Sequence, residues 1–449
     1  MPSPAPRKCC LLILLDGLAD RAQPLLGGLT PLQYAATPHL DALAARGANG
    51  HWHAAQVGQA LPSETAHYLM MGYGLEEFPG RGWLEALGLG LTPADGQVFI
   101  LARLAAAEPL AAGGFQVRER FPRLAPDEAA EFYQAVAAFE SPAGTARFHP
   151  TKRGQGVLAL SGPGLTPWVT DSDPLCEDAP WLAPGPWAGW EDDPATGRTL
   201  ELLSGYLAAC HARLAGHPLN QARRAAGLAP VNAVLTHRPG APGRAPSLAE
   251  RWGLRVLSIS SSALYQGVFL SLGAEAQLLP QDPDPAADMA GKLKLALARA
   301  ADSDLIHLHT KLPDEMGHAG DPRGKARALE ALDRGLAGLA GALAQRPELV
   351  VAVTGDHATP SSGGGGLTGT LIHSGEASPL ILAGQGVWQD GVSRFDEVAA
   401  AGGALHLLRG PELMLLILNY LDRAKLQGLR DDPQDLPFYP GPARQLFLT

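Results

Sequence analysis

The chain has 449 residues, and because one domain commonly spans about 150 residues, this length predicts two or three domains. A composition of 46% hydrophobic and 18% charged residues is typical of a globular protein and excludes a disordered or fibrous chain. The formal net charge of −10 argues against a general binder of nucleic acid or of anionic membranes, because no basic field dominates.

Two further features bear on the cellular compartment. The cysteines are Cys9, Cys10, Cys176 and Cys210. Their spacing fits neither a disulfide framework nor a CxxC zinc site, so we expect core thiols in a reducing compartment. The apolar run near the N-terminus stops at Asp16, too short for a signal peptide, and no later run approaches the ~20 residues of a membrane span. A cytoplasmic location without a membrane partner is therefore expected.

The N-terminal part predicts a strand followed by a helix. Cys9–Leu15 is a continuous apolar run closed by Asp16, which is typical of a buried parallel strand that ends in a turn. Thr37 as N-cap and Pro38 at the first helical position predict that a helix starts there, and Gly47 is its expected C-cap. A strand, a loop and a helix in this order indicate an α/β fold.

The same alternation returns late in the chain. Residues 304–309 and Leu349–Thr354 predict buried strands, and residues 379–382 predict a further short one. Leucines in residues 325–346 alternate at spacings of three and four, which predicts one amphipathic helix. Strands that alternate with helices indicate a mostly parallel sheet with helices on both faces.

Between these blocks the chain changes character and predicts an inserted α+β domain. Residues from about 90 to 250 contain Pro- and Trp-rich loops and a few helical stretches, such as residues 127–139. Glycines such as Gly80 and Gly82 on one side and a Pro- and Gly-rich stretch on the other are plausible hinges. We therefore expect a core in two parts, residues 1–88 and 251–449, with the insert at 89–250.

Three apolar strands end in a carboxylate or run into one: Asp16, Asp314 and Asp356. Ligands of open α/β sheets bind beyond the carboxyl ends of the strands, although a single aspartate there is usually a turn residue. His318 stands four residues after Asp314, and His357 follows Asp356 directly. These pairs, unlike a lone aspartate, suit a metal site.

A third histidine and the donor types extend the prediction. His373 follows a Gly-rich stretch, residues 363–366, that could return a distant imidazole to the site. Mixed carboxylate and imidazole ligands suit Mn²⁺ or Zn²⁺, and Mg²⁺ less well. Two ions a few Å apart stabilise the attacking and leaving oxygens of a displacement at phosphorus.

Ser63, in the stretch LPSETAH, is the candidate nucleophile. Pro62 favours a turn before it, and Ser63 can open the next helix. The alternative is a plain N-cap serine with Glu64 in the first helical turn. Local sequence leaves both interpretations open.

Seven motifs occur in order along the chain: LLDGLAD, TPHLDALAARG, LPSETAHYLMMGY, GRGWLEALG, TKLPDEMGHAGD, TGDHATP and IHSGEASPLIL. As a set, this sequence resembles the archaeal-type cofactor-independent phosphoglycerate mutases of the alkaline phosphatase superfamily. Weaker matches, TDSDP, HPLNQARRAAG and VNAVL, lie in the insert, so the resemblance covers nearly the whole chain. It implies an alkaline-phosphatase-like core with an inserted cap domain.

The resemblance also implies a mechanism, in which a serine at a site with two divalent metals takes the phosphoryl group and returns it to the other hydroxyl of glycerate. One metal would be held by Asp16, Ser63, Asp356 and His357. The other would be held by Asp314, His318 and His373. For both sites Mn²⁺ is the preferred ion, and Zn²⁺ or Mg²⁺ are the alternatives. Ser63 would be the nucleophile.

The cap would supply groups that bind the substrate carboxylate and phosphate. The implied substrate residues are Arg120, Arg123, Asp171, Arg223, Arg238 and Lys311. The sequence departs from the family here, because the arginine spacing is altered and Gln266 stands where the family has a lysine. A glutamine carries no cation, so the phosphate would be stabilised from elsewhere, for instance by Lys311.

Three functions remain open at this point. The first is interconversion of 3-phosphoglycerate and 2-phosphoglycerate through phospho-Ser63. The second, motivated by Gln266 and the altered arginines, is a metal-dependent phosphatase or phosphotransferase that acts on another phosphomonoester. The third is a catalytically silent binder of a phosphorylated ligand, but such a descendant is expected to lose a metal ligand or the nucleophile, and all seven residues are present.

Overall fold

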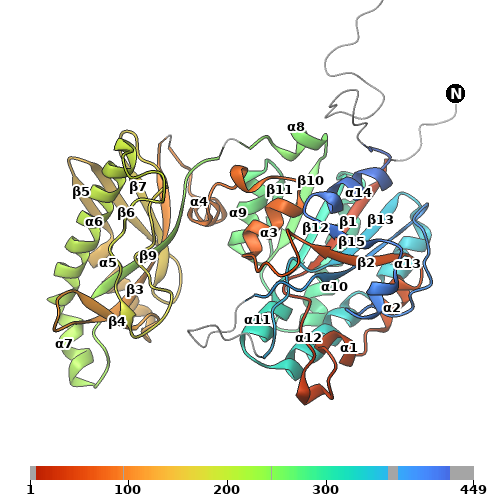
Figure 1. The fold of residues 1–449 in the computed structure, drawn as a ribbon, viewed down its shortest axis with the longest axis horizontal. Helices are drawn as coiled ribbons and strands as arrows, with labels where there is room; N and C mark the ends of the chain where they lie inside the picture. The colour runs from red at the N-terminus through yellow and green to blue at the C-terminus, as the bar shows by residue number, and fades with distance from the viewer. Residues whose placement is uncertain (1–6, 95, 244, 363–372, 425–449) are drawn as a thin grey trace, which may run out of the picture. The chain divides into compact units, whose positions relative to one another are not determined.

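The computed structural model describes residues 7–94, 96–243, 245–362 and 373–424, and the chain divides into two compact units. The first unit comprises Met1–Phe78 and Ala245–Thr449, and the second comprises Pro79–Arg244 (Figure 1). The second unit is thus inserted in the sequence of the first. Within the described ranges, no helix combines the length and the apolar character that spanning a membrane requires.

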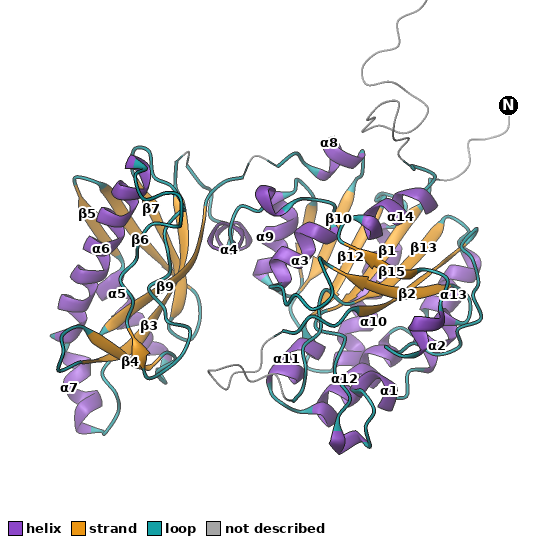
Figure 2. Ribbon diagram, viewed as in Figure 1, coloured by secondary structure: helices purple, strands orange, loops and turns teal. Residues whose placement is uncertain are grey.

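The first unit is built on an eight-stranded mixed sheet (Figure 2). Its strands, in spatial order, are β11 (Glu275–Leu278), β10 (Val256–Ser260), β12 (Leu305–Thr310), β1 (Cys9–Leu15), β13 (Leu349–Thr354), β14 (Ser378–Gly384), β2 (Ala48–His53) and β15 (His406–Arg409). The pairs from β11 to β13 are parallel, as the alternation of strands and helices predicts. β14 runs antiparallel to both β13 and β2, so the sheet is mixed.

Helices cover both faces of this sheet (Figure 1). One face carries α2 (Pro38–Ala44), α10 (Pro285–Arg299), α12 (Pro322–Gly335) and α13 (Leu339–Gln345). The other face carries α3 (Ser63–Met70), α9 (Ala263–Ser271) and α14 (Glu412–Tyr420). Shorter helices of this unit are η1 (Pro24–Leu26), α1 (Pro31–Tyr34), η2 (Leu75–Glu77), α8 (Leu248–Trp252), α11 (Leu312–His318) and η3 (Ala399–Gly402).

The single helix predicted over residues 325–346 is wrong, because the structure has α12 and α13 with a break between them. Gly335 ends α12 where α10 packs closely: a Cβ there would lie 2.7 Å from the carbonyl oxygen of Ala286. Glycine also weakens a helix, and Gly338 stands immediately before α13. Periodic leucines indicate which face of a helical segment is buried, but they do not indicate that the helix is interrupted between them.

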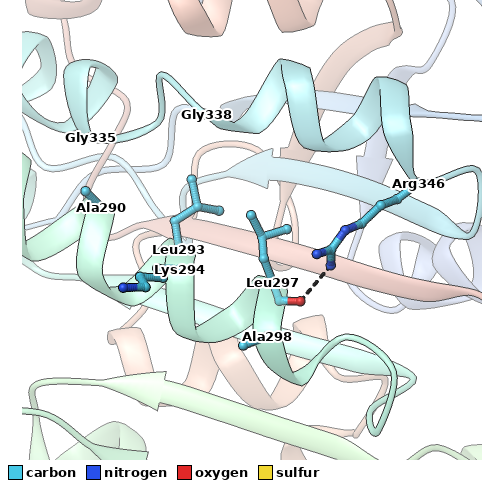
Figure 3. A pocket seen from close by; sticks show the side chains of 8 residues that line it. All are labelled: Ala290, Leu293, Lys294, Leu297, Ala298, Gly335, Gly338 and Arg346. Atoms are coloured by element: carbon cyan, nitrogen blue, oxygen red, sulfur yellow. Dashed lines mark hydrogen bonds between the residues drawn. The ribbon is translucent and has the colours of Figure 1, made fainter.

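This break leaves a pocket of about 420 Å³ against α10 (Figure 3). Leu293, Leu297 and Gly335 contribute to its wall, and Arg346 Nη1 donates a hydrogen bond to the carbonyl oxygen of Leu297. None of the seven predicted metal and nucleophile residues lines it.

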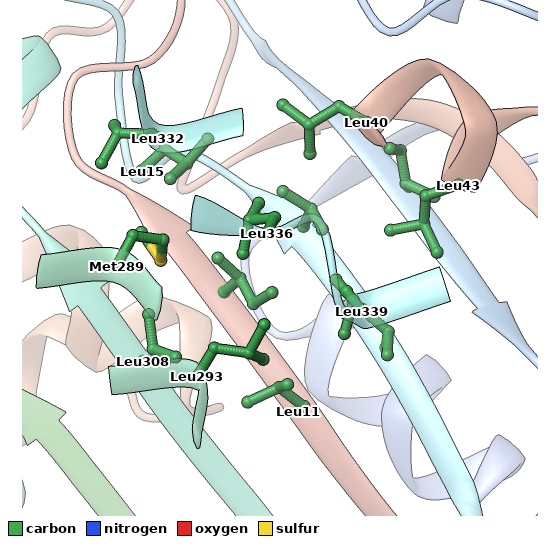
Figure 4. Close-up of a cluster of buried hydrophobic side chains, with 14 of the residues drawn as sticks. Leu11, Leu15, Leu40, Leu43, Met289, Leu293, Leu308, Leu332, Leu336 and Leu339 are labelled. Carbon is green, nitrogen blue, oxygen red and sulfur yellow. The ribbon is translucent and has the colours of Figure 1, made fainter. Parts of the chain in front are cut away.

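The core of the first unit lies between the sheet and the α2, α10, α12 and α13 face (Figure 4). Leu11 and Leu15 of β1 pack there with Leu40, Met289 and Leu332 from three helices. Because side chains alternate along a strand, Leu12 and Leu14 of β1 point to the other face. The same alternation on β12 sends two histidines away from this core.

The second unit is built on an antiparallel sheet of its own. Its strands run in the order β5 (Ala138–Ser141), β6 (Gly144–Pro150), β7 (Gln155–Ser161), β3 (Val98–Pro109), β4 (Phe115–Glu119) and β8 (Ala179–Pro180), and β9 (Ala233–Gly240) also pairs with β3. Its helices are α4 (Arg81–Gly88), α5 (Pro126–Val136), α6 (Pro194–Ala215) and α7 (Pro218–Ala225). Phe132 of α5 and Tyr206 of α6 pack in a hydrophobic core within this unit.

The glycines interpreted as a hinge have a packing role in the structure. α4 packs on β3 and β9 within the second unit, which starts at Pro79, whereas the sequence predicts that the insert starts at residue 89. A Cβ at Gly82 would lie 2.0 Å from the carbonyl oxygen of Phe99. Gly80 has φ +88°, a conformation that favours glycine. Both glycines therefore let α4 approach the sheet.

Candidate functional site

The structure brings the seven predicted residues together in the first unit: Asp16, Ser63, Asp314, His318, Asp356, His357 and His373. Asp16 follows β1, Asp356 follows β13, and α11, which carries Asp314, follows β12. β1 pairs in parallel with both β12 and β13, so these three segments leave the same edge of the sheet. Parallel pairing is therefore what collects residues that lie hundreds of positions apart.

Asp16, Asp356 and His357 form one set of close ligand atoms, here named the Asp16 group. His357 Nε2 lies 3.4 Å from Asp16 Oδ1 and 3.3 Å from Asp356 Oδ2. The same nitrogen lies 2.9 Å from Ser63 Oγ. Ser63 is the first residue of α3 and Pro62 is the N-cap, so the structure does not use Ser63 as a plain N-cap.

Asp314, His318 and His373 form a second set, here named the Asp314 group. Asp314 Oδ1 lies 3.2 Å from His318 Nε2 and 3.5 Å from His373 Nε2. His373 Nδ1 lies 2.7 Å from the carbonyl oxygen of Leu61 and donates to it when it carries the proton. That tautomer leaves Nε2 as an acceptor that faces the carboxylate.

Thr359 and Lys311 connect the two groups. Thr359 Oγ1 donates to Asp314 Oδ1 at 2.7 Å and lies 3.2 Å from His357 Nδ1. Lys311 Nζ lies 2.8 Å from Asp314 Oδ2 and 3.6 Å from Asp16 Oδ2. Thr359 was not predicted, although it stands in the TGDHATP motif. Lys311 was predicted as a substrate residue and lies at the carboxylates.

The electrostatics of the Asp16 group favour a bound cation. Burial alone would raise the pKa of Asp16, but Lys311 and the hydrogen bond from His309 outweigh it and hold the pKa well below its ordinary value. Burial and the neighbouring Asp16 raise the pKa of Asp356 well above its ordinary value. Burial and His373 lower the pKa of His357 to about 3, so its ring is neutral at pH 7 and can act as a ligand.

Two buried carboxylate oxygens provide a test of whether the residues fit metal ions. Asp16 Oδ1 and Asp356 Oδ2 have no hydrogen-bond partner among the described residues. A buried carboxylate oxygen without a donor is costly, and a divalent cation removes that cost. The donor set of carboxylates and imidazoles matches Mn²⁺ and Zn²⁺. The residues present therefore fit such ions.

A wall of buried aromatic rings behind Asp16 was not predicted. Tyr265 OH donates to Asp16 Oδ2, and His309 Nε2 lies 3.2 Å from the same oxygen. His67 Nδ1 lies 2.7 Å from the carbonyl oxygen of Ser63, and burial lowers the pKa of His67 to about 4. His67 stands four residues after Ser63, a spacing that could have indicated it, whereas Tyr265 and His309 give no local signal.

Lys325 supports the loops that carry the site. Its side chain is fully buried, and Nζ donates to Asp20 Oδ2 at 3.0 Å and to the carbonyl oxygen of Thr359 at 2.9 Å. Asp20 Oδ2 also accepts from the backbone N–H of Ser361 at 3.0 Å. This buried ion pair thus ties the segment after β1 to the segment after β13.

Three of the predicted substrate residues lie near one another in the second unit. Arg120 makes a bidentate pair with Asp173, with distances of 2.9 and 2.8 Å. Asp171 Oδ1 accepts from the backbone N–H of Arg238 at 2.7 Å. The backbone N–H of Asp173 donates to the carbonyl oxygen of Thr236 at 3.0 Å, which ties the TDSDP segment to β9.

Arg103 and His237 belong to the same cluster and were not predicted. Arg103 Nη2 lies 3.1 Å from His237 Nε2, and Arg103 Nε lies 3.5 Å from Asp173 Oδ2. Burial lowers the pKa of Arg103 to about 10 and, with the charge of Arg103, lowers that of His237 to about 3. Arg103 Nε and Nη1 have no hydrogen-bond partner among the described residues.

Arg123 and Arg223 lie together in a different arrangement. Arg223 is buried, and its guanidinium donates to the carbonyl oxygens of Ala229 and Arg123 and to Glu128 Oε1. Arg123 is exposed and accepts one of these bonds through its backbone. These contacts hold α5 and α7 together.

Comparison with known proteins adds three kinds of similarity. Residues 8–420 match the family model described as the Metalloenzyme superfamily. The chain is 33% identical to 2,3-bisphosphoglycerate-independent phosphoglycerate mutase 2 of Methanocaldococcus jannaschii, over 94% of this chain and 95% of that protein. It is 32% identical to the corresponding mutase of Methanoculleus marisnigri, over 93% of this chain and 98% of that protein.

Solved structures are similar over the same length. The PH0037 protein of Pyrococcus horikoshii matches with a TM-score of 0.75 and 27% identity, covering 94% of this chain and 100% of that one. A cofactor-independent phosphoglycerate mutase of Thermoplasma acidophilum matches with a TM-score of 0.64 and 26% identity, covering 92% and 100%.

Proposed function

The chain belongs to the Metalloenzyme superfamily and, within it, to the cofactor-independent phosphoglycerate mutases, and on this premise we propose that Ser63 carries the phosphoryl group between the two hydroxyls of glycerate. The resemblance to this family found in the seven motifs is thereby confirmed. The observation that carries the proposal is the position of Ser63 Oγ, 2.9 Å from His357 Nε2 and next to the Asp16 group.

Two divalent cations complete the proposed site. The Asp16 group with Ser63 would hold one, the Asp314 group would hold the other, and the donor types suit Mn²⁺ or Zn²⁺. When bound, the ions would stabilise the negative charge of the attacking and leaving oxygens at phosphorus. This pairing of donors rests on the distances within each group and on the buried oxygens of Asp16 and Asp356 that lack a donor.

The chain's own residues then perform two successive transfers. In the first, a bond forms between Ser63 Oγ and phosphorus while the bond between phosphorus and O3 of 3-phosphoglycerate breaks. The Ser63 hydroxyl loses a proton, and O3 of glycerate gains one. The second transfer reverses these events at O2. Ser63 opens α3, and the positive end of the helix dipole favours negative charge at this position.

The second unit is proposed to recognise the anionic substrate, as a cap of an alkaline-phosphatase-like core would. Arg103, Arg120 and Arg238 gather near Asp171 and Asp173. Arg103 Nε and Nη1 have no hydrogen-bond partner among the described residues, although Nε lies 3.5 Å from Asp173 Oδ2. A carboxylate or phosphate would supply an acceptor for this buried guanidinium. Guanidinium groups suit such planar or tetrahedral anions because they bind them with two parallel hydrogen bonds.

An enolase-coupled assay with 3-phosphoglycerate and Mn²⁺ tests the proposal, with Ser63→Ala as the control. We expect 2-phosphoglycerate from the wild type and a phosphorylated Ser63 in the acid-quenched enzyme. Phosphorus NMR of the same reaction measures free phosphate, which would indicate the phosphatase alternative that Gln266 motivates. Wild-type protein that forms neither product would contradict the proposal.

A further inference from the structure

Among the described residues, hydrogen-bond donors contact only one of the two carboxylate oxygens of Asp16. Its Oδ2 accepts from Tyr265 OH, lies 3.2 Å from His309 Nε2 and lies 3.6 Å from Lys311 Nζ. Its Oδ1 has no hydrogen-bond partner among the described residues, and it lies 3.4 Å from His357 Nε2. All the donors thus meet one oxygen, and the other oxygen is directed toward the remaining ligands of the Asp16 group.

The sheet places His309 at this position. In the parallel pairing of β1 with β12, Leu14 is opposite His309 and Leu15 is opposite Thr310. The backbone N–H of Asp16 then donates to the carbonyl oxygen of Thr310 at 3.0 Å. Because side chains alternate along β12, His309 points away from the face on which Leu308 joins the main core.

Tyr265 reaches the same oxygen from α9. α9 follows β10, which pairs with β12, so its residues pack over the face on which His309 lies. The rings of Tyr265 and His309 are 3.7 Å apart between centroids, and both side chains are almost completely buried. The ring of His67 packs on Tyr265 at 4.7 Å, while His67 Nδ1 contacts the carbonyl oxygen of Ser63. The ring of Tyr265 is therefore packed between two imidazole rings while its OH donates to Asp16.

We infer that Tyr265 and His309 are positioning residues that hold Asp16 so that Oδ1 alone faces the cation. The inference rests on the proposed function, since it assigns the cation to the Asp16 group. Two hydrogen bonds to one oxygen fix the torsion of a carboxylate, and partners of this kind orient metal ligands in proteins. Without them, Asp16 would rotate or turn both oxygens to the cation, and the spacing to Ser63 would change.

The test is Mn²⁺ binding to the full chain, measured by titration calorimetry and by electron paramagnetic resonance on metal-free protein. Tyr265→Phe keeps the ring and removes the donor, and His309→Leu removes the other donor. Each substitution should lower the affinity for one of two Mn²⁺ ions by about 10- to 100-fold and leave the affinity for the second ion unchanged. His309→Gln keeps an N–H at a similar reach and should recover most of the affinity.

Tyr206→Phe is the matched control. Tyr206 is equally buried, its OH donates one hydrogen bond to the carbonyl oxygen of Val136, and it belongs to the second unit. The Tyr206→Phe variant should bind both Mn²⁺ ions with the affinities of the wild type. If His309→Leu fails to fold, Tyr265→Phe still carries the test, because it preserves the packing volume.

Equal affinities of wild type, Tyr265→Phe and His309→Leu for both ions would overturn the inference and leave the proposed function in place. A wild type that binds no Mn²⁺ would overturn both. Asp16→Asn identifies the ion concerned, since it should lose the same ion that Tyr265→Phe weakens. Loss of the other ion in Tyr265→Phe would also contradict the inference.

Discussion

The imidazole rings of His357 and His373 stack with their centroids 3.6 Å apart and their planes 18° from parallel. The first ring belongs to the Asp16 group and the second to the Asp314 group. Two protonated rings could not remain in this arrangement at low cost, and burial together with His373 lowers the pKa of His357 to about 3. The two groups therefore meet at these stacked rings, while each keeps its own carboxylate ligands.

Removal of the proposed nucleophile should abolish turnover without unfolding the protein. Ser63→Ala deletes one buried hydroxyl, and we expect the mutase rate to fall by at least about 1,000-fold. The coupled assay measures the rate, and mass spectrometry of quenched enzyme locates the phosphoryl group. A phosphopeptide from another residue in the wild type would contradict the assignment of Ser63.

Removal of the Thr359 hydroxyl should disturb both metal groups at once. Thr359→Val keeps the shape of the side chain and deletes the donor to Asp314 Oδ1 and the contact with His357 Nδ1. We expect affinity for both ions to fall about 10-fold or more, measured by chelator competition. Thr145→Val, on β6 of the second unit, is the control and should leave both affinities unchanged.

Loss of the Lys325 ammonium should destabilise the first unit. Lys325→Met leaves Asp20 buried without its cation, a defect that costs about 3–5 kcal/mol. Urea unfolding of the metal-free protein measures the free energy of unfolding. Lys294→Met, at an exposed position of α10, should change it by less than about 0.5 kcal/mol. An equally small effect of Lys325→Met would show that the ion pair contributes nothing.

Asp304 should contribute a stability that depends on pH. Burial alone would raise its pKa, but hydrogen bonds from Arg255 and the charges of Arg423 and Arg7 lower it below the ordinary value of 3.8. The folded protein then holds Asp304 unprotonated at pH values where the unfolded chain binds a proton. The stabilisation is therefore complete above about pH 5 and is lost as the pH falls below about 4.

Asp304→Asn tests this dependence. We expect the variant to be about 2 kcal/mol less stable than wild type at pH 7, and the difference to shrink between pH 4 and pH 3. Urea unfolding at a series of pH values measures the difference. A difference that stays constant down to pH 3 would contradict the lowered pKa of Asp304.

Arg103→Met should affect substrate binding more than the chemical steps. If the Arg103 nitrogens that lack a hydrogen-bond partner among the described residues meet the substrate anion, we expect KM for 3-phosphoglycerate to rise about 10- to 100-fold with a smaller change in kcat. Arg147→Met, at an exposed position of β6, is the control and should keep both constants. A fall in kcat alone would indicate that Arg103 acts in another way.

Local sequence patterns predicted those features of this protein that depend only on residues close together in the chain. The apolar runs that form β1 and β13 predict strands with the bounds that the structure has, because a strand buried on both faces must be apolar throughout. The seven motifs identified the family, because they occur together and in order along the chain. The long helix over residues 325–346 was wrong because close packing of α10 at Gly335, which is not local, decides where α12 ends.

Tertiary structure alone decided which side chains surround the predicted residues. Tyr265, His309 and Thr359 meet Asp16 and Asp314 because β10, β12, β1 and β13 pair in parallel, and no periodicity in the sequence encodes that order. It also assigned Lys325, which the sequence predicts as part of a helix, to a buried ion pair with Asp20. The type and motif of the residues predict which of them carry chemistry, whereas neighbours that are distant in the chain decide which oxygen of Asp16 lacks a hydrogen-bond donor among the described residues.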